Sequence, residues 1–291
     1  MSNSLLFDRR YTLHIIPPAG DDARLIEGLH IKFNITKTLF GQPNIAEINI
    51  FNPNEDTIGL LKAKYTKIVL NAGYGNDLRI IFQGEVQNAL QSKTAVDRMI
   101  TVFARDGFRD YQQASFSKTF DSKVDMQSIL MEVLGEFLDV VPGDLSGIPK
   151  VRDKPNGLTL DGQVSRILDD LAEEYNADWS IQDGVVNVLG RDNTLREDEL
   201  VFISATTGML GSPRVTEIGA DVTALLNINL IPGARFAIQA LGSEVQLGNL
   251  FYRTERIRTD ASGLYKVRSV NIKGDSRDGN DWQSIIQGQR L

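Results

Sequence analysis

The densest group of carboxylates in the sequence is a candidate for acid–base chemistry. Asp169, Asp170, Glu173 and Glu174 lie within six consecutive positions. A glycosidase needs two such carboxylates, one as the acid and one as the base or nucleophile. A catalytic acid must be buried for its pKa to rise, whereas these residues share the polar face of an amphipathic helix. We therefore interpret the cluster as a solvated helix face, and we predict no catalytic residue in this chain.

Two loops have some of the residues that a phosphate or a metal ion would need. Gly73-Tyr74-Gly75 matches part of a phosphate-binding loop, but a strand follows it where that motif requires a helix, so we predict a hairpin tip. The segment 275–281 carries three carboxylates, but Arg277 interrupts it and the spacing of a calcium loop is not met. The histidines, His14 and His30, stand apart from each other. We predict a surface turn at 275–281, no metal site and no cofactor.

The composition favours a structural or binding protein over an enzyme. The chain has 291 residues, of which 42% are hydrophobic and 24% charged, as in globular proteins of two or three domains. Cysteine is absent, which excludes disulfides and thiolate chemistry and suits a reducing cytoplasm. No apolar run approaches the ~20 residues of a membrane helix. The start, MSNSLLFDRR, lacks a basic region followed by an apolar stretch, so we expect neither a membrane span nor a signal peptide.

The charge is concentrated in the middle of the chain. Residues 1–110 have a net charge of +1, residues 111–210 of −10 and residues 211–291 of +2. An acidic segment stays solvated, whereas near-neutral segments pack more easily against copies of themselves. We therefore expect the middle block on the outside of an assembly.

Basic side chains do not form the stripe that nucleic-acid binding requires. They group loosely at Lys62, Lys64 and Lys67, and at Arg253, Arg256 and Arg258. With a pI near 5.0, we expect no specific nucleic-acid binding and a role for these residues at subunit interfaces.

Hydrophobic periodicity predicts the order strands, helices, strands. Strands are predicted over 30–37, 46–50, 67–71, 78–82, 98–104, 179–181, 185–189, 226–230, 236–240, 252–259 and 265–273, and helices over 55–61, 125–138 and 161–175. Asp125 is a predicted N-cap, and Asp183-Gly184 predicts a tight hairpin turn because glycine accepts positive φ.

This order predicts a mainly β fold with a small α+β insertion. The predicted domains are an N-terminal β-barrel over 1–110, an acidic helix–hairpin insertion over 111–210 and a C-terminal β-barrel over 211–291. The two β blocks have similar size and near-neutral charge, and we interpret them as two similar barrels, the pattern expected of a duplicated barrel with a domain inserted between the copies.

Several segments, taken in order, resemble baseplate hub proteins of contractile-tailed phages, which are related to type VI secretion and bacteriocin spike hubs. The segments are 31–37, 43–52 and Phe82-Gln83-Gly84-Glu85-Val86 for the first barrel, 158–184 for the insertion, and 211–214, 225–233 and 265–282 for the second barrel. Their specificity lies in their order, because each segment is short.

The resemblance implies a structural subunit without catalytic residues. It implies a homotrimer whose six barrels form a pseudo-sixfold ring that adapts the sixfold tail tube to the threefold central spike. The implied partners are the tail tube protein, the central spike protein and baseplate wedge proteins. The implied location is the tail baseplate of the virion, after assembly in the host cytoplasm. The sequence does not separate a phage hub from a type VI or bacteriocin hub.

Two other functions stay open on the sequence. A peptidoglycan hydrolase would use carboxylates such as Asp169 and Glu173. A carbohydrate-binding module of a tail tip would present an aromatic-rich strand face, which the sequence does not predict.

Overall fold

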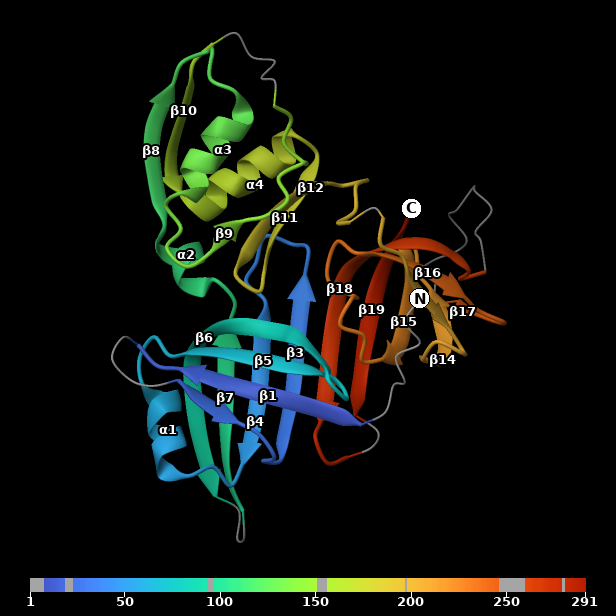
Figure 1. Cartoon of the computed structure of the whole chain (residues 1–291). Helices are drawn as coiled ribbons and strands as arrows, with labels where there is room; N and C mark the ends of the chain where they lie inside the picture. The colour runs from blue at the N-terminus through green and yellow to red at the C-terminus, as the bar shows by residue number, and fades with distance from the viewer. Residues whose placement is uncertain are drawn as a thin grey trace.

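The computed structural model describes residues 8–18, 23–93, 97–150, 156–196, 198–245, 260–278 and 281–291. These residues are mainly β and bury two hydrophobic clusters. One cluster combines strands from both ends of the chain, and the other runs from Ala114 to Val188. Figure 1 shows a middle unit that stands on two β blocks lying side by side.

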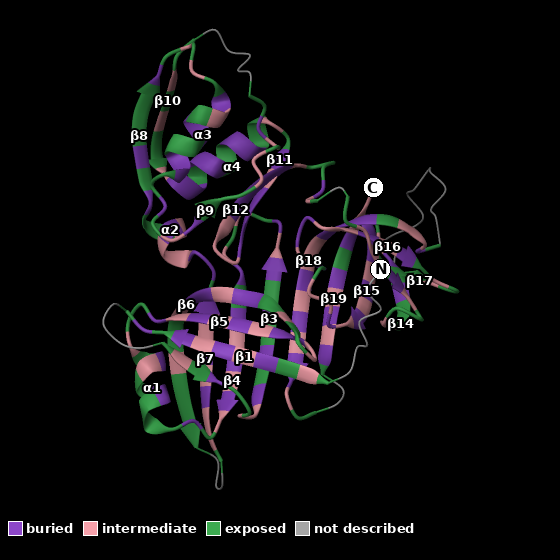
Figure 2. Ribbon diagram, viewed as in Figure 1, coloured by how far each residue is buried: buried purple, intermediate pink, exposed green. Residues whose placement is uncertain are grey.

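The first β block contains the alternating strands that the sequence predicts. Its elements are β1 (Arg9–Ile16), β2 (Arg24–Ile26), β3 (Ile31–Thr38), β4 (Ile45–Phe51), α1 (Glu55–Lys62), β5 (Lys67–Tyr74), β6 (Asp77–Lys93) and β7 (Arg98–Arg105). Along β3 and β4 buried and less buried residues alternate, as Figure 2 shows, which confirms the predicted half-buried strands. The long strand β6 pairs with β5 up to Glu85 and with β7 from Glu85 onward, so it carries the sheet around a bend.

The middle unit has its own core. Its elements are α2 (Phe108–Gln113), β8 (Ser115–Phe120), α3 (Met126–Leu134), β9 (Val141–Pro142), β10 (Leu158–Gln163), α4 (Val164–Glu174), β11 (Ala177–Gln182) and β12 (Val185–Gly190). Asp125 caps α3 as predicted, because its side chain accepts the Ser128 N–H. The predicted helix start at Asp161 is wrong: residues 158–163 pair with β8 as β10, and the helix begins only after that pairing ends.

The second β block returns to strands. Its elements are β13 (Val201–Ser204), β14 (Met209–Val215), β15 (Gly219–Leu225), β16 (Arg235–Gln239), β17 (Glu244–Val245), β18 (Gly263–Asp275) and β19 (Trp282–Arg290). The strands predicted over 236–240 and 265–273 are confirmed as β16 and β18. The strand predicted over 226–230 is wrong, because these residues turn: the Leu230 N–H bonds to the Asn227 carbonyl. The strand predicted over 252–259 lies outside the described residues.

One antiparallel pairing joins the two β blocks into a single sheet. β18 pairs with β3 from Ser269 opposite Thr38 to Asp275 opposite Lys32. Within the described residues the path of paired strands is open, with β2 at one end and β17 at the other. Neither block therefore closes into the ring of paired strands that a barrel prediction implies. In the first block, β1 carries β2 on its outer edge and does not return to β3.

The two β blocks share one strand order. The hydrogen-bonded order is β3-β4-β7-β6-β5-β1 in the first block and β14-β15-β19-β18-β16-β13 in the second. Corresponding strands also follow one another in the same order along the chain. Only the last pair differs in direction: β5 and β1 are antiparallel, whereas β16 and β13 are parallel.

The register of the two blocks also corresponds. The long strand of each block has a β-bulge. In β6 the bulge is at Gln87, where β6 pairs with β7, and in β18 it is at Arg268, where β18 pairs with β19. Superposing the two bulges places Ala46 of β4 on Ala220 of β15. From that pair onward, buried and half-buried residues alternate in step along both strands. The second block is thus a structural counterpart of the first.

The close contact between β18 and β3 predicts that Gly274 is sensitive to substitution. A Cβ on Gly274 would stand 2.0 Å from the Phe33 ring of the opposite strand. We expect Gly274→Ala to lower the free energy of unfolding by about 1–3 kcal/mol, because the ring must be displaced. Urea denaturation measures this. The control Gly59→Ala, on the exposed side of α1 with no atom within 4 Å, should raise stability by about 0.5–1 kcal/mol. A Gly274→Ala protein as stable as the wild type would contradict this account of the packing.

Candidate assembly surfaces

The carboxylate cluster of α4 lies on the surface of the middle unit. Asp169, Asp170, Glu173 and Glu174 are all exposed, while the opposite side of the helix packs into the core of the unit. Asp169 accepts a hydrogen bond from the indole Nε1 of Trp179 at 2.7 Å, which ties α4 to β11. The predicted solvated helix face is confirmed.

The two glycine and aspartate loops also have structural roles. Gly75 takes a left-handed φ of 56° between β5 and β6, so the predicted hairpin tip is confirmed. Asp275 ends β18, where its buried carboxylate contacts His30 Nε2 at 2.8 Å and Lys32 Nζ at 2.9 Å. In the part of the chain that the structure describes, no cluster of three metal-ligating side chains is found.

The charged carboxylate of Asp275 stabilises one end of the pairing between β18 and β3 through its contacts with His30 and Lys32. Burial raises the pKa of its carboxyl, but hydrogen bonds from Lys32, from two backbone amides and from His30 outweigh burial and hold the pKa well below its usual range. The amides are those of Arg277 and Asp278. The carboxylate therefore stays ionised while it binds residues of the opposite block.

A buried ion pair fixes the middle unit to the first β block. Lys37 of β3 is only 1% exposed, and its Nζ lies 2.7 and 2.6 Å from the two carboxylate oxygens of Asp183. Asp183 is at the tip of the β11–β12 hairpin, with a left-handed φ of 54°. The sequence predicts this hairpin but not its docking. The available signal is that Lys37 continues the buried phase of Ile31, Phe33 and Ile35 in β3, a phase that carries apolar residues elsewhere.

Asp106 completes this contact from the first block. Its carboxylate accepts the N–H of Asp183 at 2.5 Å and the N–H of Gly184 at 2.9 Å. Burial, and then the neighbouring charge of Asp183, raises the pKa of Asp106 to about 7, although Lys37 and the two amides act in the opposite direction. Asp106 therefore holds the backbone of the hairpin tip, while Lys37 holds the side chain of Asp183.

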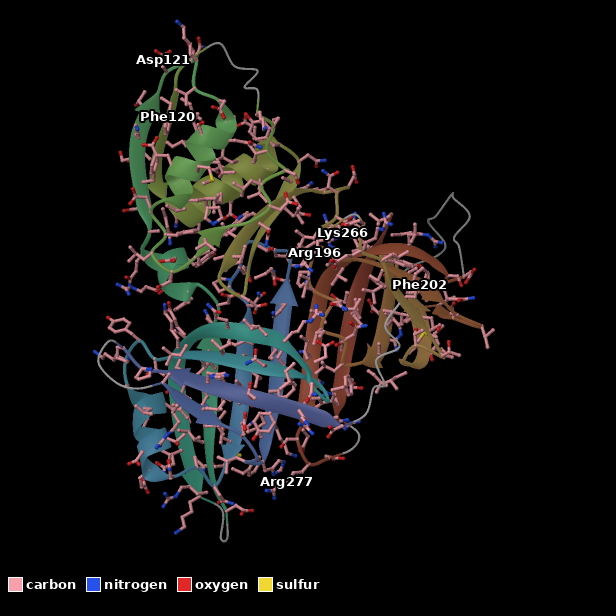
Figure 3. All side chains as sticks on the ribbon, in the orientation of Figure 1. Phe120, Asp121, Arg196, Phe202, Lys266 and Arg277 are labelled. Carbon is pink, nitrogen blue, oxygen red and sulfur yellow. The ribbon has the colours of Figure 1, made fainter. Side chains whose placement is uncertain are left out.

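A second buried lysine holds the other end of the same hairpin. Lys266 of β18 is fully buried, and its Nζ donates to the carbonyls of Gly190 and Arg191 at 3.1 and 3.2 Å. Figure 3 shows Lys266 at the top of the second block, beside the segment that leaves the middle unit. Burial lowers the pKa of Lys266. Each β block therefore contributes one buried lysine to the β11–β12 hairpin.

Two strand edges are left open at the ends of this architecture. In the described part of the chain, residues 88–93 of β6 pair with β7 on one side and with no strand on the other. They are mostly exposed, with Leu90 53% exposed. On the side away from β15, the described residues that pair with β14 are the two of β17, at Arg214 and Val215. Open strand edges present unpaired backbone groups and favour pairing with another chain.

A pocket lies beside the open part of β6. It has a volume of about 390 Å³ and lies between the end of α1, the start of the β6 edge and α2. Its lining includes apolar Leu61, Val86 and Phe108 and the basic side chains of Lys62, Lys64 and Arg109. Its position next to an open edge makes it part of the same candidate surface.

The outward face of the joined sheet is polar and mixes amide and hydroxyl side chains with charged ones of both signs, among them Lys32, Glu47 and Lys273. Asn271 of β18 donates to Asn34 Oδ1 at 2.7 Å and to Thr36 Oγ1 at 3.0 Å, both in β3. On the neighbouring strands, Thr101 donates to Asn49 at 2.6 Å. These side chains form a band of hydrogen bonds that crosses the boundary between the two β blocks.

Known proteins resemble this chain in fold. No protein-family model and no curated protein matches its sequence. A tail protein from Neisseria meningitidis has a TM-score of 0.62 at 8% identity, and the prophage MuSo2 43 kDa tail protein from Shewanella oneidensis has 0.62 at 12% identity; each match covers 97% of both chains.

A third similar structure is that of an E. coli component of the type VI secretion system, which is described as structurally similar to the T4 tail proteins gp27 and gp5. It has a TM-score of 0.59 at 9% identity and covers 95% of this chain and 76% of that one. The chain thus has the fold of phage tail proteins and of a type VI secretion component. No helix among the described residues is long and apolar enough to cross a membrane.

The ion pair at the docked hairpin predicts unequal effects of removing its two partners. Asp183→Ala leaves the Lys37 charge buried without its partner, which should cost about 3–5 kcal/mol of unfolding free energy. Lys37→Met should cost less, because Asp183 is partly exposed and keeps the Gln83 N–H. Chemical denaturation of both variants tests this, and the reverse order of stability would contradict it.

The raised pKa of Asp106 predicts a pH dependence of stability. Between the ordinary pKa of Asp, about 4, and about 7, the folded chain holds a proton that the unfolded chain releases. This group therefore makes stability fall as the pH rises through that window, by at most about 1.4 kcal/mol per pH unit. Asp106→Asn should flatten the urea midpoint against pH there, and the exposed control Asp121→Asn should not. Equal slopes in all three proteins would contradict the raised pKa.

Proposed function

We propose that this chain is a structural baseplate hub subunit of a contractile tail. In this proposal three copies form a ring of six similar β blocks. The ring adapts a sixfold tail tube to a threefold central spike. The chain has no catalytic role of its own.

The observation that carries the proposal is the shared topology of the two β blocks. They agree in strand order, in the bulge of the long strand and in the register of the central strands. A trimer of a chain with two equivalent units has six equivalent units around its axis, which a single-block subunit would not provide. The likeness to two phage tail proteins and a type VI secretion component supports the same assignment.

The outward band of the sheet supports a role as the lining of a channel. Its amide and hydroxyl side chains hydrogen-bond to one another, and its charged side chains carry both signs, as Glu47 and Lys273 on either side of Asn34 do. Such a lining suits passage without retention, because affinity for nucleic acid comes mainly from Lys and Arg contacts with phosphates. We propose that this face points toward the axis of the ring.

The remaining parts of the proposal follow from this placement. We propose three domains as predicted, over 1–110, 111–210 and 211–291, with the second boundary moved to before β13, because Val201–Ser204 pair with β16 of the second β block. Each β domain acts as one barrel-like unit, and the acidic middle domain lies at the periphery. The proposed partners are further copies, the tail tube protein, the central spike protein and baseplate wedge proteins. The proposed location is the baseplate of a virion tail, assembled in the host cytoplasm; a type VI or bacteriocin hub would use the same architecture.

The stoichiometry of the assembled protein tests this function. Native mass spectrometry of the chain, alone at high concentration and with its spike and tube proteins, should show three chains of 32.3 kDa per complex. Two unlike edges per subunit generate a ring when the rotation between neighbours closes, and the proposed threefold symmetry closes it after three copies. Only monomers or only twofold complexes in all of these mixtures would contradict the proposal.

A further inference from the structure

The junction between the two β blocks of one chain has three recognisable parts. The C-terminal half of β18, residues 269–275, pairs through its edge with β3. The loop after β3 then reaches the bulge of β18, where the Leu39 N–H donates to the Arg268 carbonyl at 2.9 Å. The Arg268 guanidinium lies over the Phe40 ring, 5.0 Å from its centroid. An edge, a partner strand and a loop that reaches the bulge thus make up one interface.

The edge, the partner strand and the loop each have a counterpart in the other β block, and within one chain these counterparts do not meet in a second junction. The counterpart of β18 is β6, whose residues 88–93 follow the bulge at Gln87 and have an open edge. The counterpart of β3 is β14, at the opposite end of the sheet. The loop after β14 is short and ends in Ile218, which is 58% exposed. The two halves of a second junction therefore exist, at opposite ends of one molecule.

We propose that the β6 edge of one copy pairs with the β14 edge of the next copy, in the register of the β18–β3 junction. This inference rests on the proposed ring and identifies its contact between subunits. The register follows from the counterparts. Asn271, three residues after one bulge, lies opposite Thr36, and Leu90 stands three residues after the other bulge. In the first block Thr36 lies opposite Ile45. The residue of the second block that corresponds to Ile45 is Gly219, and its carbonyl accepts the N–H of Thr216, so Thr216 corresponds to Thr36. Leu90 of one copy then lies opposite Thr216 of the next.

In this register the loop between β14 and β15 of one copy lies next to the pocket beside β6 of the other copy. The tip of the β14–β15 loop, Glu217 and Ile218, comes opposite the start of the β6 edge, where Gln87, Asn88 and Ala89 line the pocket. An exposed isoleucine gains by entering a pocket with apolar walls, and a carboxylate beside it complements basic side chains. The pocket is lined by three basic side chains, those of Lys62, Lys64 and Arg109, and by one acidic side chain, that of Glu85, so basic groups are in excess.

The pairing requires β17 to leave the edge of β14. In the single chain β17 bonds to β14 over two residue pairs, Arg214 with Glu244 and Val215 with Val245. The proposed pairing uses the same edge over a longer stretch, as the seven pairs between β18 and β3 do. The proposed antiparallel pairing covers more residue pairs than the described contact between β17 and β14 does, so the β14 edge gains backbone partners on assembly.

The absence of cysteine allows a direct test by disulfide trapping. Opposed residues of an antiparallel pair have Cα atoms about 4.5–5.5 Å apart, within the range that a disulfide spans. The variant carrying Leu90→Cys and Thr216→Cys, oxidised as the full chain, should move mostly into covalent dimers and trimers on non-reducing gels. The matched control, Thr36→Cys with Asn271→Cys, uses the opposed pair within the chain and should form a disulfide without any ladder. The variant carrying Leu90→Cys and Val215→Cys is one residue out of register and should cross-link much less.

The outcomes separate this contact from the ring itself. A ladder that stops at three chains supports both. A native trimer without cross-linking between positions 90 and 216, while the internal control pair oxidises, overturns the proposed contact and leaves the ring standing. A ladder that continues beyond three chains supports the contact and overturns the closed ring. A protein that stays monomeric at every concentration, in native mass spectra and on gels, overturns both.

Discussion

The structure depends on the antiparallel pairing of β18 with β3. This pairing brings residues from opposite ends of the chain into adjacent strands and makes one sheet of two similar blocks. Its geometry leaves little freedom: Gly274 accommodates the Phe33 ring, and the carboxylate of Asp275 binds His30 and Lys32. Because the blocks are fixed to each other by a strand pairing and not by a flexible linker, their relative orientation is a property of the fold.

The middle unit is attached to this sheet by buried charges. Its β11–β12 hairpin is held at the tip by Lys37 and at the base by Lys266, one lysine from each block. Buried charges are costly unless they are paired and hydrogen-bonded, so they hold a unit in one position more strictly than an apolar contact of the same size would. The unit that carries most of the negative charge is therefore placed by both blocks at once.

Local patterning predicted the elements whose environment is local. The alternation in β3 and β4, the helices α3 and α4 and the turn at Asp183 are short-range features, and the structure has them. The failures arise from long-range pairing. The start of α4 was misplaced because β8, far away in sequence, recruits residues 158–163 into a strand. Whether the described strands close into a ring depends on which edges find partners, and no short pattern encodes that.

The candidate surfaces were the least accessible to sequence reasoning. Lys37 and Asp183 are 146 positions apart, and only the out-of-place lysine in an apolar phase hints at their contact. The correspondence between β6 and β18 lies in their bulges and pairing, and no sequence motif repeated in the two strands announces it. The similarity of the two blocks is therefore visible in their topology and not in their sequences.

The central claim is that one chain supplies two equivalent units of a sixfold arrangement. A density map of the assembled tail tip, resolved to individual strands, tests it most directly. The account predicts six β blocks around the axis, alternating between the first and second block, with adjacent blocks joined edge to edge both within and between chains. A tip in which only one block of each chain surrounds the axis, or in which the blocks meet through faces and not through strand edges, would contradict it.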